Sequence, residues 1–279
     1  MCSTKIGLDR DVSDQFYTKP DIAKLCFEKI ESLYDIKDHC FMEPSAGAGA
    51  FLNLCPPGSV GYDIDPKCDN IIKGDFLTVN FISLGIDVIN RYRKTLIMVG
   101  NPPFGRQSKL ARQFITKSCE ISKIIAFILP KSFKKPSMQK CFQKCYHLIL
   151  CDDLPDNSFI VDGHEHNTPT VFQIWERKDY DRKQEEKVTE QDWYKFVKNN
   201  ECPDISIRRV GVNAGAAKPF DSSHSPQSHY FIKLKTIDLI ETVLYDLEYL
   251  TEWSHNNTVG PRSISKNELK EILNSISIE

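Results

Sequence analysis

The tetrapeptide Asn101-Pro102-Pro103-Phe104 combines residue types that can hold a planar amino group. Two consecutive prolines fix φ and remove two N–H donors, so the carbonyl group before them cannot return to a helix or a strand ladder. That carbonyl is expected to be a free acceptor. The Asn101 side chain offers a second acceptor oxygen, and Phe104 offers a flat apolar face. Two acceptors and a ring can grip an –NH₂ group and stack on the heterocycle that bears it.

Three earlier segments offer groups that a nucleoside can use. Gly47 and Gly49 form a glycine-rich turn, which lets a ligand approach the backbone and presents N–H groups. Taken alone, this pair is equally well explained as a tight turn. Asp63 ends the next expected strand, where a ribose hydroxyl needs an acceptor. Asp75 and Phe76 end a third, and offer an acceptor for an adenine amino group and a ring for its face.

Together these segments predict a nucleoside-bearing cofactor rather than a dinucleotide. A nicotinamide cofactor prefers the pattern G-x-G-x-x-G with a small final residue, and the final position here is Leu52. The dinucleotide interpretation is therefore disfavoured.

The elements that must position these residues alternate in type. Apolar runs separated by amphipathic stretches are typical of βαβ units and a mostly parallel, doubly wound α/β sheet. We expect a Rossmann-like sheet of seven strands whose last two strands form an antiparallel hairpin joined by a loop. Strands are predicted near 40–43, 59–64, 71–75, 95–100, 123–129, 147–151 and 169–176, and helices near 20–34, 48–54, 107–120 and 136–145.

The composition changes after Trp175. Residues 176–187 are a mixed-charge run that indicates a solvated linker. The region that follows is predicted to be small and α+β. Strands are expected near 205–210 and 229–234, with helices near 236–250 and from Ser265, where Ser265-x-x-Glu268 is a capping box.

Length and charge limit how a polyanion could be bound. The 279 residues carry 36 basic and 38 acidic side chains, a formal net charge of −2, so a nucleic acid must be held by a local patch. Lys131, Lys134 and Lys135 form such a patch around Phe133, although a solvated helix start explains it too. Arg208 and Arg209 form a second basic spot.

The ten cysteines and the paired histidines do not predict a metal site. The cysteines are scattered through apolar stretches without any C-x-x-C pair, and His164 and His166 have no third ligand nearby. The apolar runs are too short to cross a bilayer, and no export signal is evident. The sequence therefore predicts a soluble, intracellular protein of the cytoplasm or nucleus, with reduced thiols.

In this order, the motifs resemble those of class I S-adenosylmethionine-dependent methyltransferases. Within that family they are similar to the N6-adenine enzymes, in which the cofactor motif precedes N-P-P-[FY]. The resemblance covers about residues 14–176 and includes the Phe16–Ala23 segment before the first strand. It implies S-adenosylmethionine as cofactor, bound by Tyr17, Thr18, Glu43, Pro44, Ala46, Gly47, Gly49, Phe51, Asp63, Ile64, Asp75, Phe76 and Asn101.

The resemblance also implies the catalytic roles. An adenine rotated out of its strand would donate its two N6 hydrogens to the Asn101 side-chain oxygen and the Pro102 carbonyl, and Phe104 would stack on its ring. DNA is the expected substrate. The alternatives are N6-adenosine in RNA, a protein glutamine as in related N-P-P-Y enzymes, or a catalytically silent binding subunit.

The expected domain organisation follows from the extent of the resemblance. Residues 14–176 form the catalytic domain, 177–188 a charged linker, and 189–279 a small C-terminal region that is a candidate for substrate recognition.

Overall fold

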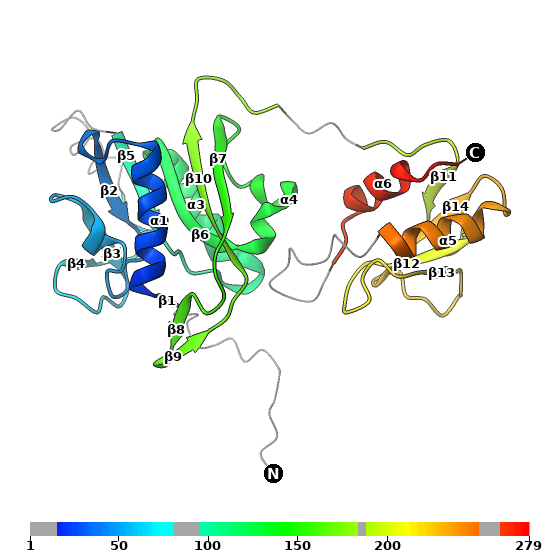
Figure 1. Ribbon diagram of the computed structural model, residues 1–279, viewed down its shortest axis with the longest axis horizontal. Coiled ribbons are helices and arrows are strands. Elements are labelled where there is room, and N and C mark those ends of the chain that lie inside the picture. The colour runs from blue at the N-terminus through cyan, green and yellow to red at the C-terminus, as the bar shows by residue number, and fades with distance from the viewer. Residues whose placement is uncertain (1–15, 81–94, 184–187, 251–262, 279) are drawn as a thin grey trace, which may run out of the picture. The chain divides into compact units, whose positions relative to one another are not determined.

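The computed structural model describes residues 16–80, 95–183, 188–250 and 263–278 of the chain. Contacts divide the chain into two compact units, residues 1–182 and 183–279, and each unit is considered by itself (Figure 1). No helix within the described ranges combines the length and apolar content needed to cross a membrane.

The first unit is built on a seven-stranded sheet of order β4-β3-β2-β5-β6-β10-β7. The strands from β4 to β6 are parallel, and β10 is antiparallel to both β6 and β7. The predicted Rossmann-like sheet with a final antiparallel hairpin is thus confirmed. Its strands are β2 (His39–Glu43), β3 (Val60–Asp63), β4 (Ile71–Lys73), β5 (Thr95–Gly100), β6 (Ile124–Pro130), β7 (Tyr146–Asp153) and β10 (Thr170–Arg177).

Helices cover both faces of this sheet because its central strands are apolar on both sides. In β5, Leu96 and Met98 pack in one core cluster with Phe114, while Ile97 and Val99 pack in the other with residues of α1. Figure 1 shows α1 and α3 with this sheet. The helices of the unit are α1 (Pro20–Leu33), α3 (Lys109–Ile121) and α4 (Pro136–Gln139), with short 3-10 helices η1 (Ile36–Asp38), η2 (Leu52–Leu54), η3 (Arg106–Ser108) and η4 (Lys131–Lys134).

A second, three-stranded sheet stands where the sequence suggested only a loop. It consists of β1 (Tyr17–Thr18), β8 (Phe159–Val161) and β9 (His164–His166) in the order β1-β8-β9. Asp162 and Gly163 join β8 to β9 with φ of +49° and +79°, the left-handed conformation of a tight hairpin turn. The Asp-Gly pair is the sequence signal for this hairpin.

Two predicted helices are wrong in extent. The stretch 48–54 contains only the 3-10 turn η2, because left-handed glycines interrupt the chain before it. The stretch 136–145 is helical only over α4. The other expected helices of this unit are confirmed within a few residues.

The second unit is α+β, as predicted. Its sheet has the order β11-β14-β12-β13, and the Ser265–Glu268 capping box is present with both of its hydrogen bonds. The sequence missed β11 and β13. The elements are β11 (Tyr194–Val197), β12 (Ile205–Arg208), β13 (Ala217–Pro219), β14 (His229–Leu234), α5 (Leu239–Leu250) and α6 (Lys266–Ser275).

Candidate active site

Asn101 follows the last residue of β5, at the edge of the sheet where the parallel strands end. Its amide Nδ2 donates a hydrogen bond of 2.9 Å to the carbonyl oxygen of Phe16. Its Oδ1 is buried and has no hydrogen-bond partner among the described residues. Because the Nδ2 bond fixes the orientation of the amide, the acceptor that remains is the side-chain oxygen that the tetrapeptide predicted.

The backbone carbonyl of Asn101 is not a free acceptor. It accepts a hydrogen bond of 3.1 Å from the hydroxyl of Ser45, which lies in the glycine-rich loop after β2. The expectation for the carbonyl before the two prolines is therefore wrong. The Ser45 bond instead ties the tetrapeptide to the loop that holds Gly47 and Gly49.

Phe104 belongs to an aromatic group beside Asn101. Its ring stacks on Phe16 with centroids 5.9 Å apart and planes at 25°, and only 6% of the residue is exposed. Phe16 also contacts Phe159 at 6.0 Å and His166 at 5.2 Å. The ring face of Phe104 toward Phe16 is thus already covered. Sequence reasoning missed Phe159 and His166 as neighbours, because the β8–β9 hairpin that carries them was taken as a loop.

The glycine turn and Asp63 form one hydrogen-bonded unit. The N–H of Gly47 donates to Asp63 Oδ2 at 2.7 Å, and the N–H of Asp65 donates to Asp63 Oδ1 at 2.8 Å. Gly47 has φ of +53°, and a Cβ there would lie 3.1 Å from the ring of Tyr17. Glycine suits this position because it adopts a positive φ without strain and has no Cβ to contact Tyr17. The structure therefore brings Tyr17, Gly47 and Asp63 together.

Glu43 holds the loop from inside rather than facing a ligand. It is 3% exposed, and its Oε2 accepts the N–H of Leu52 at 2.8 Å. Burial raises the pKa of this carboxyl well above its ordinary value, and the nearby Asp63 raises it further, against the N–H bonds from Leu52 and Phe51. A Cβ on Gly100 would lie 3.1 Å from Glu43 Cγ, so the strand ends of β2 and β5 meet closely here.

Several predicted cofactor residues are buried in the protein. Phe76 is 1% exposed and stacks on Phe114 with centroids 5.2 Å apart. The sequence suggested that this ring would cover an adenine, but it is packed in the core and is not free to do so. Phe51 lies in the core, and Pro44 and Ala46 are buried as well.

Of the other predicted residues, Thr18 is buried, whereas Ile64 and Asp75 are exposed. Thr18 Oγ1 has no hydrogen-bond partner among the described residues. Ile64 is 64% exposed, directly after Asp63. Asp75 is exposed, and its Oδ1 accepts the N–H of Leu77 at 2.9 Å. Ile64 and Asp75 therefore present an apolar side chain and a carboxylate to solvent.

The predicted lysine patch is partly neutralised by Asp153, at the end of β7. Lys131 lies 3.3 Å and Lys134 2.7 Å from its carboxylate oxygens, while Lys135 is half-buried. Burial acts to raise the pKa of Asp153, but hydrogen bonds from Lys134 and Lys131 outweigh it and lower the pKa below its ordinary value. The carboxylate is therefore ionised at neutral pH, and these lysines are not free cations.

Replacing Asp153 with asparagine leaves Lys131 and Lys134 unpaired. If these lysines contact phosphates, Asp153→Asn strengthens oligonucleotide binding by about fivefold at low salt, because one negative charge is removed beside them. Fluorescence anisotropy with a labelled oligonucleotide measures this. The control is Glu120→Gln, the same charge change at an exposed position on α3. Unchanged binding in Asp153→Asn would assign the two lysines to structure alone.

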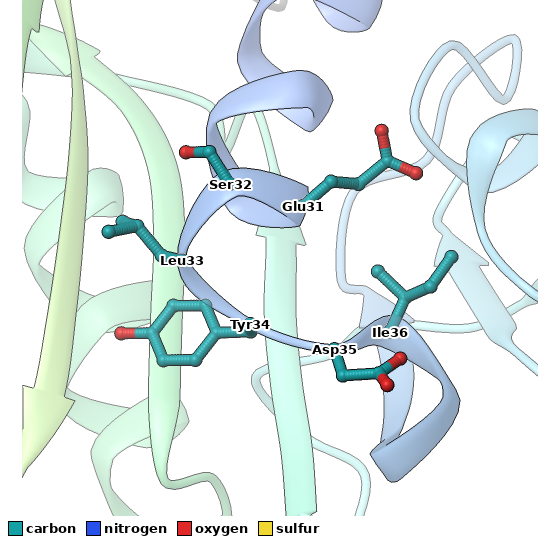
Figure 2. Close-up of a pocket in the computed structure, with 6 residues that line it drawn as sticks. All are labelled: Glu31, Ser32, Leu33, Tyr34, Asp35 and Ile36. Atoms are coloured by element: carbon teal, nitrogen blue, oxygen red, sulfur yellow. The ribbon is translucent and has the colours of Figure 1, made fainter.

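A surface depression lies at the other side of the first unit, where α1 ends. It is lined by the six consecutive residues 31–36, and Figure 2 shows Leu33 and Tyr34 pointing away from Glu31 and Ile36. These side chains do not converge on a common centre, and none is a predicted site residue. In the described part of the chain, no cluster of three or more His, Cys, Asp or Glu side chains is arranged to hold a metal.

Residues 61–189 match the family model of the EDM2 methyltransferase-like domain. The matched range is somewhat less than half of the chain. It includes Asp63, Asp75, the tetrapeptide from Asn101 and the lysine patch. This part of the chain is methyltransferase-like in sequence. No curated protein matches the chain.

Solved structures similar to the chain include three methyltransferases. A provisionally assigned RNA methyltransferase from Pyrococcus horikoshii is 16% identical, with a TM-score of 0.41 over 59% of this chain and 87% of that one. A provisionally assigned class I S-adenosylmethionine-dependent methyltransferase from Listeria monocytogenes is 17% identical, with a TM-score of 0.41 over 65% and 66%. An S-adenosylmethionine-dependent methyltransferase from Anabaena variabilis is 8% identical, with a TM-score of 0.39 over 58% and 87%.

Proposed function

We propose that the chain transfers a methyl group from S-adenosylmethionine to N6 of adenine in DNA. The observation that carries this proposal is the buried, unpartnered Oδ1 of Asn101. A buried acceptor without a donor costs about 1–3 kcal/mol, so its presence needs a reason. A ligand amino group supplies the missing donor.

The orientation of the Asn101 amide supports an amino group over an acceptor ligand. Because Nδ2 is already bonded to the Phe16 carbonyl, the amide has only its oxygen left for this ligand. The resemblance to N6-adenine methyltransferases assigns the same role to this oxygen. The methyltransferase-like match over residues 61–189 supports the reaction class.

The residues at the carboxyl edge fit S-adenosylmethionine, which supplies an electrophilic sulfonium methyl group when bound. Each Asp63 oxygen accepts one N–H and keeps acceptor capacity for a ribose hydroxyl. Ile64 exposes an apolar side chain that an adenine ring can cover, and Asp75 an exposed carboxylate. We assign cofactor contact to these residues and the Gly47 turn, and a supporting role to Glu43.

In the proposed mechanism the tetrapeptide prepares the nucleophile. Asn101 Oδ1 and the Pro102 carbonyl accept the two N6 hydrogens and favour a pyramidal nitrogen, whose lone pair leaves conjugation with the purine. N6 gains partial positive charge as its bond to the methyl carbon forms and the bond from that carbon to sulfur breaks, which would leave S-adenosylhomocysteine as an uncharged thioether. The fixed dipoles of the two acceptors stabilise the charge on N6. One N6 proton then passes to solvent. No strong general base is required.

A labelling experiment tests the reaction and its substrate. The protein is incubated with methyl-labelled S-adenosylmethionine and with DNA or RNA oligonucleotides of the same sequence, which are then digested to nucleosides. We expect label in N6-methyldeoxyadenosine. Label in N6-methyladenosine alone would make RNA the substrate, and label only in methylcytosine or in protein would refute the proposal.

Calorimetric titration with S-adenosylmethionine completes that test. Binding of the cofactor without methylation of any oligonucleotide is the result expected of a catalytically silent subunit. Absence of binding would remove the cofactor assignment as well.

A further inference from the structure

Each strand of the C-terminal sheet carries one exposed cation, and all four lie on the same face. They are Lys195 in β11, Lys233 in β14, Arg208 in β12 and Lys218 in β13. Residues that pair directly across neighbouring strands point to the same face, as do every second residue along a strand. Lys195 pairs with Lys233 across β11 and β14. Ser206 of β12 pairs with Lys218 of β13 on one side and with Phe231 of β14 on the other, so these residues share the face of Lys233. We call this side the cationic face.

The helices of the unit pack on the opposite face. Ile205, Ile207, Ile232 and Leu234 alternate with the cationic residues and form the core with apolar residues of α5 and α6. The four strands contain no acidic residue, whereas α5 contains three acids and no base. The four strands therefore carry only basic charge and α5 only acidic charge, whereas α6 carries two lysines and two glutamates.

Three of the four cations are available to a ligand. Lys233 lies 2.8 Å from Asp204 and is neutralised. Lys195, Arg208 and Lys218 make no ion pair with any described residue. Arg208 donates one hydrogen bond, from Nε to the carbonyl of Val210 at 3.1 Å, and this leaves its charge unpaired.

Rings lie among these cations. Phe220 packs edge-on against Phe231 of β14 with centroids 5.7 Å apart. His224 stacks on His229, the partner of Arg208 in the register, at 4.5 Å, and is held by a 2.6 Å hydrogen bond with Ser206. Phe231 is itself 4% exposed, so the rings within reach of a base are the half-buried Phe220, His224 and His229. Cations beside planar rings on a sheet are a combination that binds single-stranded nucleic acid, through phosphates and base stacking.

We propose that the cationic face binds the phosphate backbone of the single-stranded nucleic acid that serves as substrate. This inference rests on the proposed function and gives the C-terminal unit a role in holding the substrate. The net charge of −2 supplies no general attraction to a polyanion, so a local concentration of unpaired cations is what such binding requires.

Removing two of the lysines tests the proposal. Affinity of the full chain for a fluorescein-labelled 20-nucleotide DNA is measured by anisotropy as a function of salt. The double variant Lys195→Ala/Lys218→Ala should bind about tenfold more weakly near 0.1 M salt, and the slope of log K against log salt should fall by about 1.4. Arg208→Gln alone should lower the slope by about half as much.

A matched variant separates this face from overall charge. Lys37→Ala/Lys198→Ala removes the same charge from exposed positions outside the face, and should bind like the wild type. Equal weakening in both double variants, or none in either, would overturn the proposal. Preferential binding of duplex DNA would overturn the single-strand assignment.

A further comparison keeps failure of this inference distinct from failure of the proposed function. Asn101→Ala should keep the wild-type slope of log K against log salt, because it removes no cation, and should methylate the oligonucleotide about 10²- to 10³-fold more slowly. Wild-type protein that binds through the cationic face but methylates no nucleic acid would refute the reaction and leave the binding face in place.

Discussion

Asn101→Ala should lower turnover about 10²- to 10³-fold while the affinity for S-adenosylmethionine changes little. The magnitude is that of removing one fixed dipole aimed at charge that develops in the transition state. The side chain is hydrogen-bonded to Phe16 and not to Gly47 or Asp63, so the hydrogen bond between those two residues is kept. Single-turnover methylation and calorimetric titration measure the two effects separately. Loss of both together would make Asn101 a residue of folding and not of catalysis.

Asn101→Asp is the companion variant, because it keeps acceptor oxygens while it loses the donor and adds a negative charge. The carboxylate has no N–H for the Phe16 carbonyl and places an oxygen against it. We expect turnover between that of the wild type and that of Asn101→Ala. If Asn101→Asp were as inactive as Asn101→Ala, the amide's orientation would matter more than its acceptor.

Gly100→Ala should destabilise the first unit by about 2–4 kcal/mol, from backbone strain and a steric clash together. Gly100 has φ of +140°, which residues with a Cβ rarely adopt, and the new Cβ would lie 3.1 Å from Glu43 Cγ and 3.3 Å from Glu43 Oε1. Glu43 cannot move away cheaply, because it is buried and holds the N–H of Leu52. Urea unfolding followed by circular dichroism measures the loss.

Gly58→Ala isolates the contribution of Glu43. Gly58 also has a positive φ, +92°, but a Cβ there meets no atom within 4 Å. Gly58→Ala should therefore lower the free energy of unfolding by only about 1 kcal/mol, the cost of backbone strain without a steric clash. Equal losses in the two variants would show that the Glu43 contact adds nothing at Gly100.

Periodic segments of the chain allowed most of the fold to be predicted. The apolar runs of β5 and β6 have six and seven residues and contain β-branched side chains, which favours buried strands over helices. The capping box at Ser265 uses only local hydrogen bonds, which a sequence specifies directly. Strand β1 has only two residues, which is too short to show an alternation of apolar and polar side chains. It is defined by its pairing with β8.

The candidate site could be predicted in its residue types but not in its contacts. Phe76 looks equally apolar whether it faces a ligand or the core, and tertiary packing on Phe114 decides for the core. Lys131 and Lys134 form a basic patch in the sequence, but in the structure both pair with Asp153. Sequence reasoning did not connect Asp153 with these lysines. The residues around Asn101 predict that its carbonyl has no hydrogen-bond donor, but the hydroxyl of Ser45 donates to it. Each miss is a contact between residues far apart in the chain.

The small sheet β1-β8-β9 connects the orientation of the Asn101 amide to the pairing of a hairpin. Tyr17 and Thr18 pair with Ile160 and Phe159, and the carbonyl of the preceding residue, Phe16, orients the Asn101 amide. The partner that orients the Asn101 amide is therefore held by a strand pairing outside the seven-stranded sheet, between segments about 140 residues apart in the chain.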